Sequence, residues 1–267
     1  MSNKKIYFAQ PWGGLGDNLC YSNLPRLYSK IGYDFNVSIL NYSRNKEIND
    51  LVWRKNKYVK SVSSFKLPNA GYIMFNKKQV NNPKYNIVQT INELHGFEPG
   101  NGFPEIYIER PIFEKSKFSA VADLNSFSLM NTQGIIYDSK YLKSLKEELS
   151  KDMVQILEFP NIYRKEVNEK NNISINSLDS LIVTLLSTDV FYCLNSGSHS
   201  LAATLKNYFG YPKKIICFNP ESDKKNIKEW GYIYPNVNYE NIPSIKNLEA
   251  YLPRKMNYYQ KILNFIS

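Results

Sequence analysis

Short apolar runs alternate with amphipathic segments along most of the chain, which predicts strands that alternate with helices. The first run, 6–9, predicts a buried strand, and the pattern after it predicts a helix over 17–31. Pro25 lies inside that helix and is expected to kink or restart it. Further strands are predicted at 35–40, 58–62, 72–75, 105–109, 118–123, 153–157, 190–194 and 214–218. Further helices are predicted at 46–53, 87–94, 141–149, 177–186, 198–208 and 247–265.

The alternation breaks once and then restarts, so the chain contains two successive βα series. This pattern predicts an α/β fold with two doubly wound parallel sheets, each covered by helices. The break at 112–117 predicts a boundary between an N-terminal domain, 1–113, and a C-terminal domain, 114–267. Ligands of such sheets bind outside the carboxyl ends of the strands, so the cleft between the domains is the expected site.

Composition narrows the class of protein. The chain has 267 residues, of which 43% are hydrophobic, enough for a substantial core. No apolar run reaches the length that crosses a bilayer, and residues 1–5 lead into the first strand without a leader-like pattern. A cytoplasmic location is therefore expected.

The 3 cysteines, Cys20, Cys193 and Cys217, are far apart and odd in number, which favours buried free thiols over a disulfide or metal framework.

The net charge of +10 predicts attraction to anions without identifying them. Nucleic acid, an anionic membrane surface and a phosphate-bearing substrate are the three candidate partners. The lysines do not gather in one stripe, and no RRM, KH or helix-turn-helix signature occurs, which disfavours nucleic acid. No Asp-x-Asp sequence occurs either, so a metal chelated by carboxylates is not expected.

A glycine-rich turn joins the first predicted strand to the first predicted helix. It contains Gly13, Gly14 and Gly16, followed by Asp17 and Asn18. Glycines bring bare backbone close to a ligand, and a helix start favours anions. An acid at such a position is of little use to a phosphate site, so Asp17 indicates chemistry on a hydroxyl. The alternative is that Asp17 only caps the helix.

A second strand-turn-helix unit lies in the C-terminal half. Its turn consists of Asn195, Ser196, Gly197, Ser198, His199 and Ser200. Gly197 permits a sharp turn, and either Ser196 or Ser198 is a suitable helix cap. Free N–H groups at the helix start make a phosphate site, although an ordinary capped βα loop has the same pattern.

The two turns together resemble the lipopolysaccharide heptosyltransferase family, glycosyltransferase family 9. Residues 14–19, GLGDNL, are similar to its N-terminal glycine loop and acid, and residues 187–203 are similar to its donor diphosphate loop. The family usually has an acid where Asn195 stands and a histidine where Ser200 stands. The resemblance implies a GT-B fold of two Rossmann-like domains, with the acceptor bound by the N-terminal domain and a nucleotide-sugar by the C-terminal domain.

The resemblance also implies metal-independent, inverting sugar transfer without a cofactor, with Asp17 as the catalytic base. The acceptor would be a bacterial surface glycan or glycolipid of lipopolysaccharide, lipooligosaccharide or capsule, so peripheral contact with the inner face of an anionic membrane is expected. Gly13, Gly14, Gly16 and Asn18 would then lie on the acceptor side. The donor would contact the second turn from Asn195 to Ser200.

Two further donor contacts are predicted. Ser126 follows the first strand of the second domain and faces the same cleft, and Glu158 ends a strand where an acid can accept from a ribose hydroxyl. His199 is expected either to contact the donor or to be an exposed helix histidine.

Other functions remain open. A nucleotide-sugar hydrolase or epimerase would share the fold and both turns. A nicotinamide-dependent dehydrogenase is disfavoured because Leu19 stands where the third glycine of its fingerprint belongs.

Overall fold

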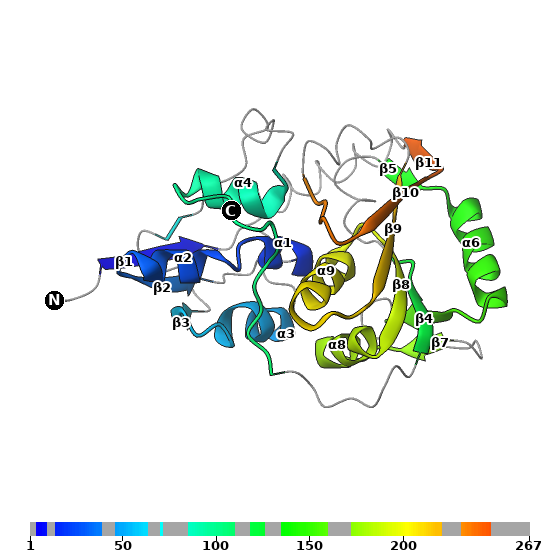
Figure 1. Ribbon diagram of the computed structural model, residues 1–267, viewed down its shortest axis with the longest axis horizontal. Helices are drawn as coiled ribbons and strands as arrows, with labels where there is room; N and C mark the ends of the chain where they lie inside the picture. Colours follow the sequence, from blue (N-terminus) through cyan, green and yellow to red (C-terminus); the bar gives the residue numbers. More distant parts are fainter. Residues whose placement is uncertain are drawn as a thin grey trace, which may run out of the picture.

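A computed structural model of the chain describes residues 4–9, 14–38, 46–63, 70–71, 85–109, 118–125, 135–159, 172–220 and 231–246. Within these residues the chain forms a three-stranded sheet, a six-stranded sheet and a two-stranded pair (Figure 1). Both larger sheets are parallel throughout, so the predicted α/β class with two parallel sheets is confirmed. The predicted boundary at 112–117 lies outside the described residues and stays a prediction.

The N-terminal half is built on the three-stranded sheet, whose strands are hydrogen-bonded in the order β1-β2-β3. Its elements are β1 (Lys4–Ala9), α1 (Leu15–Cys20), α2 (Leu24–Lys30), β2 (Tyr33–Ser38), α3 (Lys46–Asn49), the π-helix η1 (Asp50–Arg54), β3 (Val59–Ser63) and α4 (Ile87–Leu94). Pro25 stands in the first turn of α2, where no intrahelical bond needs its missing N–H. The helix therefore restarts at this point, as one of the two predicted outcomes.

The C-terminal half is built on the six-stranded sheet. Its strands are β4 (Phe118–Asp123), β6 (Gln155–Glu158), β7 (Asn172–Ser174), β8 (Thr188–Leu194), β9 (Lys214–Pro220) and β10 (Asn238–Ile242). They lie in the order β10-β9-β8-β4-β6-β7. If the six strands are renumbered 1 to 6 in chain order and the sheet is followed from β7 to β10, the order is 3-2-1-4-5-6, that of a doubly wound fold. The order in which the strands are added changes direction between β4 and β8.

Helices cover both faces of the six-stranded sheet. On one face α6 (Ser139–Lys151) contributes Leu145 and Leu149 to a cluster of buried side chains. On the other face α8 (Leu178–Leu186) and α9 (Gly197–Phe209) contribute to a larger cluster, which also contains Phe8 and Trp53 of the N-terminal half. Helices α8 and α9 therefore lie between the two sheets (Figure 1).

Some predicted elements differ from the structure. Residues 103–109 form no strand, because the Glu105 N–H donates to Ser22 Oγ at 2.7 Å instead of to a sheet neighbour. The antiparallel pair of β5 (Ile135–Tyr137) and β11 (Ser244–Lys246) was not predicted, nor were β7 and β10. The predicted elements at 72–75 and 247–265 lie outside the described residues. The 3 cysteines are buried and free, which confirms that prediction.

Asn18 fixes the first glycine turn from within the core. Its side chain is 0% exposed, and its Nδ2 donates to the Gly14 carbonyl at 2.8 Å. Its Oδ1 accepts from Trp53 Nε1 at 2.8 Å, which ties the turn to η1. Buried polar groups are stable only when paired in this way. In this structure Asn18 thus holds the turn, and its contact with an acceptor stays a prediction.

The Asn18→Ala variant tests this role. It removes the bond to Gly14 and leaves the buried Trp53 N–H without its acceptor. We expect the free energy of unfolding to fall by about 2 kcal/mol, measured by urea denaturation. The matched control is Asn207→Ala, at an exposed position of α9, which is expected to change stability by less than about 0.5 kcal/mol. Equal effects of the two substitutions would contradict this role.

Candidate functional site

The reversal of strand order between β4 and β8 marks the place where doubly wound sheets bind ligands. Asp123 is the last residue of β4 and lies in register with Cys193 of β8. The chain leaves β8 through Asn195 and Ser196 and then begins α9 at Gly197. The second glycine turn therefore stands at the carboxyl edge of the sheet, directly at the reversal.

Ser196 is the N-cap of α9, but its side chain makes no capping hydrogen bond. Its hydroxyl instead lies 2.8 Å from Ser198 Oγ. The first turn of α9 contains no acidic residue. The first N–H groups of a helix have no intrahelical partners and carry partial positive charge. At the start of α9 neither a capping side chain nor a carboxylate of the first turn pairs with them.

Asp123 is a site residue that the sequence analysis missed. Its side chain is 3% exposed and accepts from Ser198 Oγ at 2.5 Å. It also accepts from the backbone N–H and the side-chain Nδ2 of Asn125, at 2.9 and 3.1 Å. Burial raises the pKa of this carboxyl, and the bonds from Ser198 and Asn125 partly oppose the rise. The only available signal was an acid closing a strand with a buried apolar pattern.

The first glycine turn shapes the position of Asp17. Gly14 is the N-cap of α1, and a Cβ placed on it would lie 2.6 Å from Asp17 Oδ2. The Asp17 carboxylate thus lies over the turn, in space that is open because residue 14 is a glycine and has no Cβ. Its Oδ1 accepts from the Tyr232 hydroxyl at 2.8 Å. Gly13 lies outside the described residues.

The two glycine turns meet. A Cβ on Gly16 would lie 3.5 Å from the Cα of Gly197. A Cβ on Gly197 would lie 2.9 Å from Leu15 Cβ and 3.2 Å from the Gly16 nitrogen. The starts of α1 and α9 are therefore in backbone contact, although Leu15 and Gly197 are far apart in sequence. Asp17 follows Gly16 directly, so it stands one residue from this contact.

Three tyrosines before and within β10 line the contact between α1 and α9. Tyr232 donates to Asp17, and the Tyr234 hydroxyl donates to Ser200 Oγ at 3.1 Å. The Tyr239 hydroxyl accepts from the Tyr234 N–H at 2.7 Å and lies 2.9 Å from His199 Nε2. Burial raises the pKa values of all three hydroxyls, so they stay protonated. Sequence reasoning missed these residues because no local motif marks them.

The side chains predicted to bind the donor differ in accessibility. Ser198, His199 and Ser200 are 6%, 0% and 1% exposed, so their side chains are not accessible to a ligand in this structure. The expectation of an exposed histidine at 199 is wrong, because that face of α9 packs against Tyr234 and Tyr239. Burial lowers the pKa of His199 to about 3.

The other predicted donor contacts remain predictions. Asn195 and Ser196 are partly exposed, and the Asn195 side chain reaches Asn219 Oδ1 at 3.4 Å. Glu158 Oε1 contacts Lys146 Nζ at 3.4 Å and Asn172 Nδ2 at 3.3 Å, so its known partners lie toward α6 and β7. Ser126 lies outside the described residues.

Solved structures with a similar arrangement of elements are glycosyltransferases. TibC, an iron-containing dodecameric glycosyltransferase from enterotoxigenic E. coli H10407, matches with a TM-score of 0.59 and 14% identity over 89% of this chain and 65% of TibC. A second structure, heptosyltransferase TibC with ADP-D-β-D-heptose, matches with a TM-score of 0.58 and 13% identity, over 88% of this chain and 62% of that one. This chain therefore spans just under two thirds of the TibC length.

A third structure shows a more complete match. The glycosyl transferase family 9 protein from Veillonella parvula DSM 2008 matches with a TM-score of 0.57 and 9% identity, over 100% of this chain and 91% of that one. The chain has the glycosyltransferase family 9 fold. The resemblance seen in the two glycine turns is thus confirmed at the level of the fold. No family model and no curated protein matches the sequence.

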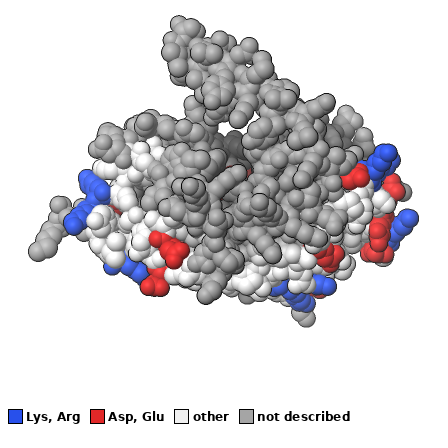
Figure 2. Space-filling view, turned by 90° about the horizontal axis from the view of Figure 1, so that it is seen from above, with Lys and Arg blue, Asp and Glu red and all other residues white. Residues whose placement is uncertain are grey.

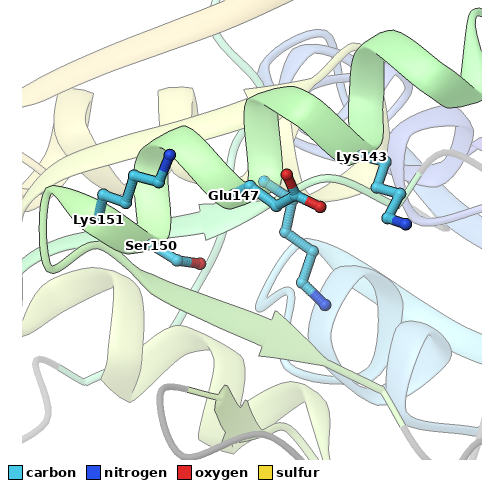
Figure 3. A pocket seen from close by; sticks show the side chains of 5 residues that line it. Lys143, Glu147, Ser150 and Lys151 are labelled. Carbon is cyan, nitrogen blue, oxygen red and sulfur yellow. The ribbon is translucent and has the colours of Figure 1, made fainter.

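A shallow pocket among the described residues lies outside the glycine turns. It is lined by Lys143, Lys146, Glu147, Ser150 and Lys151, all on α6 (Figure 3). Helix α6 covers the face of the sheet opposite α9, so this pocket is separate from the glycine turns (Figure 1). On the face shown in Figure 2, described lysines and arginines lie at separate points with acids near them.

The described residues contain neither a metal-binding cluster nor a membrane span. No group of three or more His, Cys, Asp or Glu side chains is placed to hold a metal ion there. No helix among these residues is both long and apolar enough to cross a bilayer.

Gly197→Ala tests the contact between the two turns. Alanine normally stabilises a helix relative to glycine, but here its Cβ would lie 2.9 Å from Leu15 Cβ. We expect the free energy of unfolding to fall by about 1–3 kcal/mol, measured by urea denaturation. Gly16→Ala lies on the other side of the contact and meets nothing closer than 3.4 Å, so it is expected to be neutral within about 0.5 kcal/mol. A stabilised Gly197→Ala protein would show that the helices are not held in this contact.

The His199→Gln variant tests whether the His199 imidazole is buried in its neutral form, through the pH dependence of protein stability. The folded-state pKa is about 3, below the usual value of about 6.5, so only the unfolded state takes up the proton as pH falls. Stability from this group is present above about pH 6.5 and is lost toward pH 3. Between pH 7 and pH 5 the wild type should lose about 2 kcal/mol more than His199→Gln in urea unfolding. Equal losses would mean that His199 is protonated in the folded protein.

Proposed function

We propose that this chain is a glycosyltransferase that moves a sugar from a nucleotide-sugar to a hydroxyl of a bacterial surface glycan, with inversion and without a metal. In the proposed GT-B arrangement, the site lies where the two glycine turns meet, between an acceptor-side N-terminal domain (1–113) and a nucleotide-sugar-binding domain (114–267). The observation that carries the proposal is the backbone contact of Gly16 with Gly197, which brings Asp17 to the start of α9. The family 9 fold and the nucleotide-sugar bound to TibC support it.

The two helix starts suit different halves of the reaction. Helix α1 carries Asp17 in its first turn, so its positive end already has a carboxylate. Helix α9 has no acid in its first turn and no side-chain cap. A diphosphate therefore fits the start of α9, where backbone N–H groups can stabilise the charge that grows on the leaving group.

Asp17 is the proposed base. The acceptor oxygen forms a bond to the anomeric carbon while the bond from that carbon to the diphosphate breaks. The proton of the acceptor hydroxyl passes to the Asp17 carboxylate, and the electron pair of the broken bond leaves on the nucleoside diphosphate. The Tyr232 hydroxyl and the space over Gly14 fix the orientation of the carboxylate, which is what a positioned base requires.

The acceptor, the donor sugar and the cellular location remain part of the proposal. Gly13, Gly14, Gly16 and Asn18 would shape the acceptor side. Lipopolysaccharide, lipooligosaccharide or capsule is the proposed acceptor class, and peripheral contact with the inner face of the cytoplasmic membrane would follow from a lipid-linked acceptor. A nucleotide-sugar hydrolase or epimerase would use the same turns, and the product distinguishes them.

Asp17→Asn is the decisive variant. The carboxamide still accepts from Tyr232 but takes no proton, so turnover of a nucleotide-sugar should fall by about 10²–10⁴-fold. Nucleoside diphosphate binding should persist, with about 2.7 kcal/mol of stabilisation at a hundred times Kd in thermal unfolding. The matched control is Asp179→Asn, an exposed acid in the first turn of α8, which should leave turnover unchanged.

Product analysis completes this experiment. The wild type is given ADP-, UDP- and GDP-sugars with and without a glycan acceptor. Sugar on the acceptor supports transfer, whereas free sugar or an isomerised nucleotide-sugar indicates the hydrolase or epimerase. Full turnover by Asp17→Asn, or a flat thermal response to every nucleotide, would overturn the proposal.

A further inference from the structure

Asp123 is a buried acid next to the start of α9, where an anion is proposed to bind. Among the described residues, its hydrogen-bond donors are Ser198 and two groups of Asn125. Among the described residues no lysine or arginine pairs with it. A buried carboxylate without a cationic partner is costly, and an anion bound nearby increases that cost. The position of Asp123 therefore calls for an explanation beyond packing.

Asp123 controls the direction of a short hydrogen-bond chain. When its carboxyl is ionised, Ser198 must donate its only hydroxyl proton to Asp123 Oδ2 at 2.5 Å. Ser198 Oγ then accepts, so the Ser196 hydroxyl donates to it across 2.8 Å. In this state the Ser196 hydroxyl already donates its hydrogen to Ser198, so it can only accept hydrogen bonds from a ligand.

Protonation of Asp123 permits the opposite direction. A proton on Oδ2 lets Asp123 donate to Ser198, and Ser198 then donates to Ser196. The Ser196 hydroxyl is thereby released to donate to an acceptor outside the chain. Ser196 is partly exposed and is the N-cap of α9, so a phosphate oxygen at the helix start is within the region it can serve.

The other described titratable groups around Asp123 have surroundings of their own. On β8 the Cys193 thiol, with Cys217 of β9 beside it, has a pKa raised by burial and stays protonated. On α9 the pKa of His199 is about 3, so its imidazole stays neutral. Beyond β4, Glu158 of β6 is paired with Lys146 of α6. Among these groups, Asp123 is the one hydrogen-bonded to the first turn of α9 through Ser198.

We propose that Asp123 is a positioning residue of the donor site. On this inference, binding of a nucleoside diphosphate transfers one proton from solvent to Asp123 and reverses the Asp123–Ser198–Ser196 chain, so that Ser196 donates to the ligand. The inference rests on the proposed function, because it takes the diphosphate to lie at the start of α9. Asp123 itself touches neither sugar nor phosphate.

Titration calorimetry tests the inference. ADP, UDP and GDP are titrated into the full chain between pH 5.5 and 8.5, in buffers of different ionisation enthalpy. The wild type should take up about one proton, and its Kd should rise by up to tenfold per pH unit on the alkaline side. Asp123→Asn carries a permanent donor toward Ser198, so it should bind without this uptake and with a Kd that no longer rises. The terminal phosphate titrates at about pH 6 itself, so the measured quantity is the difference between the two proteins.

Two serine variants separate the chain from a general structural role. Ser196→Ala should weaken binding by about ten- to a hundredfold, because it removes the donor to the charged ligand. Ser198→Ala keeps the acid and breaks the chain, so it should reduce proton uptake even where Asp123→Asn fails to fold. The exposed Asn207→Ala variant should match the wild type in both measurements.

The outcomes distinguish the two proposals. Proton uptake that is the same in the wild type and Asp123→Asn, or in the wild type and Ser198→Ala, would overturn the role of Asp123 and leave the proposed function standing. If none of the three diphosphates binds to the wild type, both proposals fail.

Discussion

The close approach of Gly197 to Leu15 and Gly16 is the constraint on which the candidate site depends. A Cβ on Gly197 would lie 2.9 Å from Leu15 Cβ, so any larger residue forces the starts of α1 and α9 apart. Packed interiors absorb such a change poorly, because the neighbours are themselves fixed. Here the neighbours are the two parallel sheets, since α9 packs on the six-stranded sheet and α1 follows the first strand of the other. The contact thus places residues of both sheets in one site.

This contact also explains why several polar residues near the site do not face a ligand. The side-chain amide of Asn18 donates to Gly14 and accepts from Trp53. The Ser200 hydroxyl accepts from Tyr234. Packing α9 between two sheets buries its whole first turn except Ser196 and Gly197. The helix start therefore leaves Ser196 and Gly197 partly exposed, while the side chains that follow pack against the neighbouring elements.

The sequence was informative where the signal is local. Glycine turns, apolar runs and Pro25 act through the residues beside them, so the α/β class and most of the helices followed from the pattern. Contacts between residues far apart in sequence depend on which strands are neighbours and on their register, and no local sequence pattern indicates them. Asp123 meets Ser198 only because β4 and β8 are neighbours with Asp123 opposite Cys193. Tyr232 reaches Asp17 across 215 positions, and the burial of His199 depends on Tyr239 of an unpredicted strand.

The two acids of the site differ in burial, and this difference separates their roles. Asp17 is partly exposed on the first turn of α1, so in the proposed reaction it is the acid that an acceptor hydroxyl would approach. Asp123 is 3% exposed beneath α9, so it can act on a ligand only through the serines above it. A single carboxylate at the meeting point of the turns would have to accept the acceptor's proton while repelling the diphosphate. In the proposed reaction, two carboxylates, one partly exposed and one buried, would let the site bind an anion at α9 and keep a proton acceptor at α1.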